Sequence, residues 1–262
     1  MQIYPNAYYN YKKDKKAAYE KEKAAKQQAI LEIYQTYNGR PGHRMMVIYL
    51  KRRSIILSKT TVLKYMKELG IRSIVVRKKR EYVKGECYKK FENHLKGEFQ
   101  AERKNEKWCT DFTYLYLADG SKRYNCSILD LYDKSIVATQ NGSRLDAQLA
   151  IDTLEKALRR NNVRKNILLH SDQGSQYTSK AFTDFCEKKQ IQQSMSKAGC
   201  PYDNAAMESF YGTFKAEFSK QTSFTTEEQL NKATEEYVYG YYNHIRPHSS
   251  NGYLTPFEKR YC

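Results

Sequence analysis

The chain has 262 residues and a formal net charge of +17. This length is enough for one well-buried core and a smaller module, so we expect two domains. The charge is concentrated at the front, where residues 1–100 carry 24 Lys and Arg against 9 Asp and Glu, while residues 101–262 carry 22 against 20. This split indicates a nucleic-acid partner for the front of the chain, ahead of an anionic membrane surface.

Composition also excludes several classes of protein. No apolar run reaches the roughly 20 residues of a membrane span, so we expect no membrane partner. The first residues lack the apolar core of a signal peptide. The six cysteines are scattered without a C-x-x-C pair, which favours reduced thiols in a cytoplasmic protein over a disulfide framework or a structural zinc site.

The front of the chain is predicted to be helical. Residues 1–38 are expected to form a basic N-terminal helix over 12–37 that ends at Asn38-Gly39. Residues 39–76 predict a pair of helices, Met45–Arg52 and Lys59–Leu69, with Ser58 as the N-cap and Gly70 closing the second. The residues expected to form the buried stripe of the second helix are Val62, Leu63, Met66 and Leu69.

This pair is similar to a helix-turn-helix, whose second helix enters the major groove of DNA. The side chains left free to meet DNA are then Lys59, Thr60, Lys64 and Lys67. A purely structural helical hairpin would share the pattern and remains the alternative. Residues 77–106 are charged and poor in aliphatic side chains, which predicts a linker.

Residues 107–262 predict an α/β domain. Three strands, over 107–117, 123–133 and 134–143, come first, and Asp119-Gly120 favours a tight hairpin turn between the first two. A helix over 146–160, a buried strand over 166–174, a helix over 179–191 and a short strand follow. This order matches the ribonuclease-H-like fold. A long helix over 226–245 ends before Pro247.

Three carboxylates lie on elements that this fold brings together. Asp111 lies in the first strand, Asp172 follows the buried strand, and Glu208 lies in a predicted helix. Carboxylate oxygens are the ligands that Mg²⁺ prefers. Two such ions, about 3.5–4 Å apart, can hold the attacking and the leaving oxygen of a phosphoryl transfer. The pattern therefore predicts metal-dependent cutting and joining of DNA.

Four further residues flank the three carboxylates. His170 precedes Asp172 by two residues, and a hydrogen-bonded structural role is favoured for it over metal binding. Gly174 would let backbone approach a phosphate. Asn204 either caps the helix of Glu208 or supports the site, and Lys215 lies two turns beyond Glu208, where it could grip the DNA backbone.

Four motifs carry a resemblance to a known family. They are W-x-x-D-x-T-Y from Trp108, H-S-D-x-G-x-Q-Y from His170, D-N-A-x-x-E-S-F-x-x-x-x-K from Asp203 and Y-N-x-x-R-P-H from Tyr242. In this order and spacing they resemble the integrase-core transposases of bacterial insertion sequences, specifically the second-frame product of the "insertion sequence three" family, which is related to retroviral integrases.

The resemblance implies a catalytic, metal-binding triad of Asp111, Asp172 and Glu208 with two Mg²⁺ ions, for which Mn²⁺ could substitute. It implies that Lys215 and Arg246 contact DNA. It also implies double-stranded DNA as partner, both element ends and target, a homo-oligomer on that DNA, and a first-frame product that supplies end recognition in the active fusion.

Two rival functions stay open at this point. A non-catalytic DNA-binding protein that modulates the full-length transposase would share the basic front of the chain. A hydrolytic nuclease would share the fold, because a fold alone does not fix the reaction.

Overall fold

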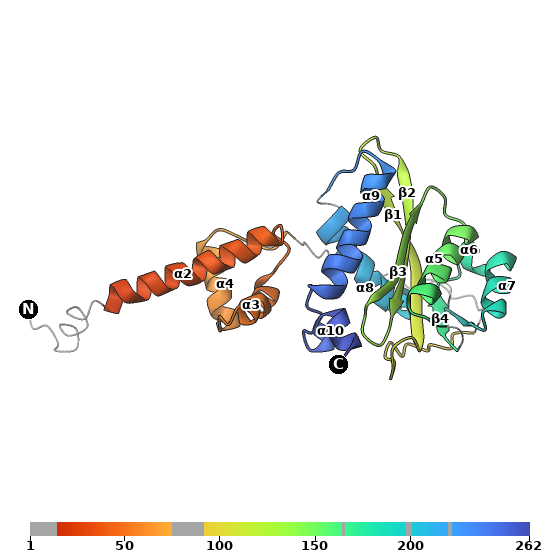
Figure 1. Cartoon of the computed structure of the whole chain (residues 1–262), viewed down its shortest axis with the longest axis horizontal. Helices are drawn as coiled ribbons and strands as arrows, with labels where there is room; N and C mark the ends of the chain where they lie inside the picture. Colours follow the sequence, from red (N-terminus) through yellow and green to blue (C-terminus); the bar gives the residue numbers. More distant parts are fainter. Residues whose placement is uncertain (1–14, 75–91, 164–165, 198–200, 220–221) are drawn as a thin grey trace, which may run out of the picture. The chain divides into compact units, whose positions relative to one another are not determined.

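The structure is a computed structural model that describes residues 15–74, 92–163, 166–197, 201–219 and 222–262. The predictions for residues 1–14, 75–91 and 198–200 lie outside these described residues. The chain divides into two compact units, residues 1–77 and 78–262, and Figure 1 labels their elements.

The first unit consists of three helices, α2 (Lys15–Thr36), α3 (His43–Arg52) and α4 (Lys59–Glu68). The second half of α2 packs on α3 and α4 through a core of Ile30, Ile33, Met46, Tyr49, Leu50, Val62, Tyr65 and Met66. The first half of α2 extends past the other two helices (Figure 1) and is mostly exposed. Apolar residues concentrate at the end of this helix, which explains why only that end is covered.

The predicted helix ends in this unit are confirmed. Gly39 and Gly70 adopt the left-handed backbone, with φ of +72° and +67°, that closes a helix. The side chain of Ser58 caps α4 by accepting a hydrogen bond from the backbone N–H of Thr61. The predicted buried stripe of α4 is wrong at one position. Tyr65 is buried, whereas Leu63 is 39% exposed.

The second unit is built on a five-stranded sheet with the strand order β3-β2-β1-β4-β5. The strands are β1 (Lys107–Tyr116), β2 (Lys122–Asp130), β3 (Ile136–Gly142), β4 (Leu168–Ser171) and β5 (Gln192–Met195). The pairs β1–β2 and β2–β3 are antiparallel, and β1–β4 and β4–β5 are parallel. This is the predicted ribonuclease-H-like arrangement.

Helices cover both faces of the sheet (Figure 1). One face carries α5 (Ala147–Arg160), α6 (Ser175–Thr178) and α7 (Lys180–Lys188), which pack on a core around Trp108, Leu154 and Phe182. The other carries η1 (Pro201–Asn204), α8 (Ala205–Phe214), the π-helical turn η2 (Lys215–Ser219), α9 (Glu227–Glu235) and the π-helical η3 (Glu236–Tyr242). The short elements η4 (Ser249–Asn251) and α10 (Pro256–Arg260) end the chain's folded part.

The second face is packed largely with aromatic rings. Phe210, Phe214, Phe218 and Tyr237 form consecutive ring contacts with centroids 4.9–5.7 Å apart. Tyr237, Tyr241 and Tyr242 are all buried, as predicted for packing residues. The long helix over 226–245 is also confirmed in outline, because Thr226 caps α9 and the helical backbone continues through η3 toward Pro247.

The described part of the predicted linker, residues 92–106, belongs to the second unit. Its Leu95 is buried and donates its backbone N–H to Ser194 of β5, and Asn105 donates its backbone N–H to Asp130 of β2. Charged composition indicated a tether here. Backbone hydrogen bonds and the buried side chain of Leu95 nevertheless attach the segment to the sheet.

Candidate active site

Two of the three predicted carboxylates come together through the pairing of β1 with β4. These parallel strands align Lys107 with Leu168 and Cys109 with His170. Continuing this register by two residues places Asp111 opposite Asp172, just where β4 has ended. The parallel strands therefore deliver both carboxylates to one edge of the sheet.

The third carboxylate reaches the same edge from α8. The side-chain amide of Asn204 donates to the backbone carbonyl of Thr110 at 3.3 Å, and the hydroxyl of Tyr211 donates to the carbonyl of Asp111 at 2.7 Å. Glu208 lies four residues after Asn204 and three before Tyr211, so it projects from the same face of the helix. Two hydrogen bonds thus hold Glu208 against β1 beside Asp111.

The electrostatics of the site show that these three carboxyl groups share one region. The pKa of Asp111 rises to about 7, first because burial disfavours its charge and then because Asp172 and Glu208 add negative charge nearby. Lys215 acts in the opposite direction on the same carboxyl group. Burial also raises the pKa of Asp172, although the backbone N–H of Gly174 donates to this carboxylate at 2.9 Å.

The donor set fits divalent cations. Three carboxylates and an amide oxygen are hard ligands of the kind that Mg²⁺ takes. Among the described residues, none forms a hydrogen bond with the buried Oδ1 atom of Asn204. The other amide atom, Nδ2, donates to the carbonyl of Thr110 and so fixes the orientation of the amide. In the described residues, no three His, Cys, Asp or Glu side chains already stand close enough to share one ion. The carboxylates thus converge without forming a closed cage.

His170 and Gly174 support this edge in ways that are internal to the fold. His170 is fully buried, and its two ring nitrogens bond with Ser194 and Ser196 at 2.9 and 3.0 Å. Burial lowers its pKa to about 4, so the ring is neutral near pH 7. At Gly174 the space that a Cβ would take is filled by the side chain of Gln176. These atoms are the far end of a flexible side chain, so packing alone does not require a glycine here, and its predicted approach to a phosphate stays an untested prediction.

Lys215 and Arg246 were both predicted to contact DNA. The electrostatic effect of Lys215 on Asp111 places its charge near the carboxylates. Arg246 makes two-pronged contact with the buried Glu217, with Nε and Nη2 donating at 2.9–3.1 Å, and its side chain is 12% exposed. That ion pair favours a structural role for Arg246, and its DNA contact stays an untested prediction.

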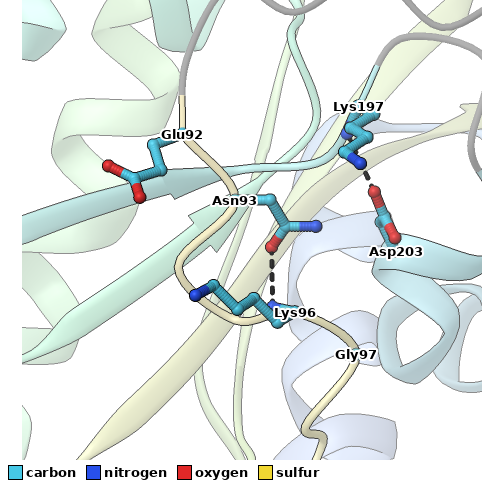
Figure 2. Close-up of a pocket in the computed structure, with 6 residues that line it drawn as sticks. All are labelled: Glu92, Asn93, Lys96, Gly97, Lys197 and Asp203. Carbon is cyan, nitrogen blue, oxygen red and sulfur yellow. Dashed lines mark hydrogen bonds between the residues drawn. The ribbon is translucent and has the colours of Figure 1, made fainter.

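The structure adds a pocket of about 520 Å³ that is lined by Asp203, next in sequence to Asn204. Figure 2 shows one side formed by the loop of residues 92–97 and the other by Lys197 and Asp203. The loop is held by Asn93, which accepts the backbone N–H of Lys96, and Asp203 accepts the backbone N–H of Lys197. Because Asp203 directly precedes Asn204, the pocket borders the site. No pattern in the sequence marked it.

Tyr211 is a second residue that sequence reasoning missed. Its hydroxyl bonds with the carbonyl of Asp111 and also lies 3.2 Å from the carbonyl of Asn125. The signal that could have found it is the helical spacing of three from Glu208, which puts a hydroxyl on the face that meets β1.

The residues of the first unit that were predicted to contact DNA are all exposed: Lys59, Thr60, Lys64 and Lys67. Lys64 lies 4.0 Å from Glu68. Neither Lys59 nor Lys67 forms an ion pair with another described residue. No helix among the described residues is long and apolar enough to cross a membrane.

Known protein families match the sequence of each of the two units. An HTH-like domain family matches residues 20–80, and two integrase core domain families match residues 101–201 and 189–256. The putative transposase InsK for insertion sequence element IS150 of Escherichia coli (strain K12) is 32% identical over 231 residues, which are 88% of this chain and 81% of that protein. The transposase InsF for insertion sequence IS3A of the same organism is 35% identical over 165 residues, 63% of this chain and 57% of that protein.

Among solved structures, the fold is similar to a chain of the simian T-cell lymphotropic virus intasome in complex with PP2A regulatory subunit B56 gamma. The TM-score is 0.52 at 14% identity, with 89% of this chain and 74% of that chain covered, which shows a shared fold. The sequence relatives and the matched domains together carry the assignment. The chain belongs to the IS3 family of insertion-sequence transposases, with an HTH-like region ahead of a DDE integrase core.

Proposed function

We propose that Asp111, Asp172 and Glu208 are the catalytic carboxylates of this transposase and bind its divalent cations, two Mg²⁺ ions with Mn²⁺ as a substitute. The observation that carries this proposal is the convergence of three carboxyl groups on the edge where β1 and β4 run parallel. The charged form of Asp111 is destabilised first by burial and then by the other two carboxylates. A cation between them would turn this repulsion into attraction.

When bound, such ions supply Lewis-acid activation of the attacking oxygen and stabilise the leaving oxygen. The chain itself supplies the alignment. Asn204 and Tyr211 fix α8 on β1, so Glu208 is presented to the two aspartates at a set position. Lys215 would hold a DNA phosphate beside the carboxylates, since its charge already acts on Asp111.

The finer partners are also proposals. We expect the exposed lysines of α4 to contact double-stranded DNA, both element ends and target. A homo-oligomer follows from the need to bring two element ends together, and a first-frame product would supply further end recognition. Cys109, Cys126 and Cys186 are buried free thiols, which suits the reducing cytoplasm where bacterial DNA lies.

The test is a strand-transfer assay with purified protein and a labelled, pre-cut element end, in Mg²⁺ and separately in Mn²⁺. We expect joined products from the native chain, none from Glu208→Gln, and native levels from Asp184→Asn, which removes an exposed carboxylate on α7. Nicks without joined products would support a hydrolytic nuclease instead. Joining that persists in Glu208→Gln would refute the assigned triad.

A further inference from the structure

The exposed face of α4 carries an apolar residue in the middle of a basic line. Lys59, Leu63 and Lys67 are four residues apart, so they follow one another along the same side of the helix. Thr60 and Lys64 lie next to this line, and all five side chains are exposed. The opposite side buries Val62, Tyr65 and Met66 in the core. Leu63 therefore lies outside the buried stripe of α4, and 39% of its surface is exposed.

Leu63 is not among the residues that form the core of the first unit, which α4 fills from its other side. A solvated helix face between lysines would ordinarily hold a polar residue. A partner that removes the exposed part of this side chain from water would gain free energy from its burial. The partner must also accept two flanking positive charges.

The charges around Leu63 favour a polyanion. Lys59 and Lys67 stand one turn before and one turn after it without ion pairs to described residues. The acid at the end of the helix, Glu68, is already neutralised by Lys23 at 3.0 Å and by Lys64 at 4.0 Å. The exposed face is thus cationic along its length, with one apolar group at its centre.

DNA offers the matching arrangement in its major groove. Two rows of phosphates flank a floor of base edges, and the C5-methyl group of thymine is the apolar feature on that floor. A helix in this groove meets phosphates with its flanking residues and base edges with its central ones. The apolar centre of α4 would then lie over base edges while the lysines reach the phosphates.

We propose that Leu63 is a specificity-determining residue that contacts the methyl group of a thymine in the element end. The lysines provide affinity that does not depend on sequence, and Leu63 selects an A·T pair at one position. This inference rests on the proposed DNA-binding role of the first unit and goes further by naming what the unit reads.

The experiment removes only the methyl group. Duplexes copied from either end of the DNA element that carries the gene are prepared with thymine and with uracil in its place, and Kd for the full chain is measured at one fixed salt concentration. We expect uracil to weaken native binding about fourfold for each thymine methyl group that Leu63 would cover, the factor that corresponds to burying one methyl group.

Three variants make the result specific. Leu63→Ala should bind the thymine duplex several-fold more weakly and should no longer distinguish it from the uracil duplex. Lys67→Ala should weaken both duplexes equally and reduce the salt dependence by about one ion, as expected for a phosphate contact. Leu145→Ala, which shortens another leucine of similar exposure (40%), should leave both affinities unchanged. Thermal melting confirms that each variant is folded.

Two outcomes would overturn the inference while leaving the transposase assignment intact. In one, the native chain binds both duplexes equally well. In the other, Leu63→Ala weakens binding but keeps the preference for thymine. If this variant also lowers the oligomeric state measured by light scattering, Leu63 contacts a second copy of the chain instead. Failure to bind any duplex would instead contradict the DNA-binding role of the first unit itself.

Discussion

The sheet carries two groups of carboxylates that are removed from water, and the fold treats them differently. Asp130, at the end of β2, and Asp133, in the turn that follows, are fully buried and are joined by the guanidinium of Arg260 at 2.9 and 2.6 Å. Asp111 and Asp172 each receive a backbone N–H instead, and neither forms an ion pair with a described Lys or Arg.

This difference separates structure from function. Arg260 also bonds with Asn105 and Asn161, so that a single cation completes a closed network between the loop before β1, the turn after β2 and the end of α5. The chain compensates those charges itself. At the edge that carries Asp111 and Asp172, we propose that a bound cation supplies most of this compensation. We therefore expect acids without their own cation to mark a binding site better than fully buried acids that have one.

The largest effect, on strand joining, should come from removing the charge of Asp111 or Asp172. Asp111→Asn and Asp172→Asn should each lower strand joining at least about a thousandfold, because the variant carboxamide is a poorer ligand for a cation. Neither variant should lower the melting temperature without added metal, since the charge of Asp111 is disfavoured by burial and by its neighbours, and that of Asp172 by burial. Joining and melting are measured on the same preparations. A variant that loses activity only by unfolding would contradict this distinction.

The second effect is on the stability that Arg260 provides by pairing with Asp130 and Asp133. Arg260→Gln leaves Asp130 and Asp133 buried without their cation, which should lower the free energy of unfolding by about 3–5 kcal/mol. Urea denaturation of the full chain measures it. Lys259→Gln, which changes the neighbouring cation that lies over the ring of Tyr132, is the matched control and should change stability by less than about 1 kcal/mol. Equal losses of stability in the two variants would contradict a specific stabilising role for the pairs between Arg260 and the two aspartates.

The smallest effect should appear only in acid. Burial and the nearby charges of Arg246 and Lys134 lower the pKa of His248 from 6.5 to about 4. Its contribution to stability is therefore complete above pH 6.5 and is lost as the pH falls toward 4, by up to about 3 kcal/mol. His248→Gln should flatten the loss of stability between pH 7 and pH 4 by up to that amount. Parallel pH profiles for the two proteins would refute the assignment.

Much of the fold was predictable because local signals and packing agree in this chain. Alternation and Asp119-Gly120 predicted the hairpin of β1 and β2, and Gly120 indeed has a φ of +81°. The placement of Asp111, Asp172 and Glu208 followed from the ribonuclease-H-like order. The predicted role of these residues in metal binding remains to be tested by the joining assay.

Other features had no local signal. Leu63 was predicted to be buried because leucine suits either side of a helix, and only the packing of α3 against α4 shows that Tyr65 takes the inner position. The segment 92–106 is polar, yet it is ordered by backbone hydrogen bonds that side-chain composition does not report. The tie between Arg260 and Asp130 spans 130 residues of sequence, beyond the reach of any periodicity.

The distance of that tie along the chain has a consequence for how the protein is made. Asp130 leaves the ribosome 130 residues ahead of Arg260. At about 5–20 residues per second, translation of the intervening segment takes on the order of ten seconds, during which β2 lacks its stabilising cation. We therefore expect the nascent integrase core to stay incompletely folded until Arg260 has left the ribosome. A chain truncated before Arg260 would lack the cation that pairs with Asp130 and Asp133. We expect such partial products to be degraded by proteases rather than to persist beside the intact transposase.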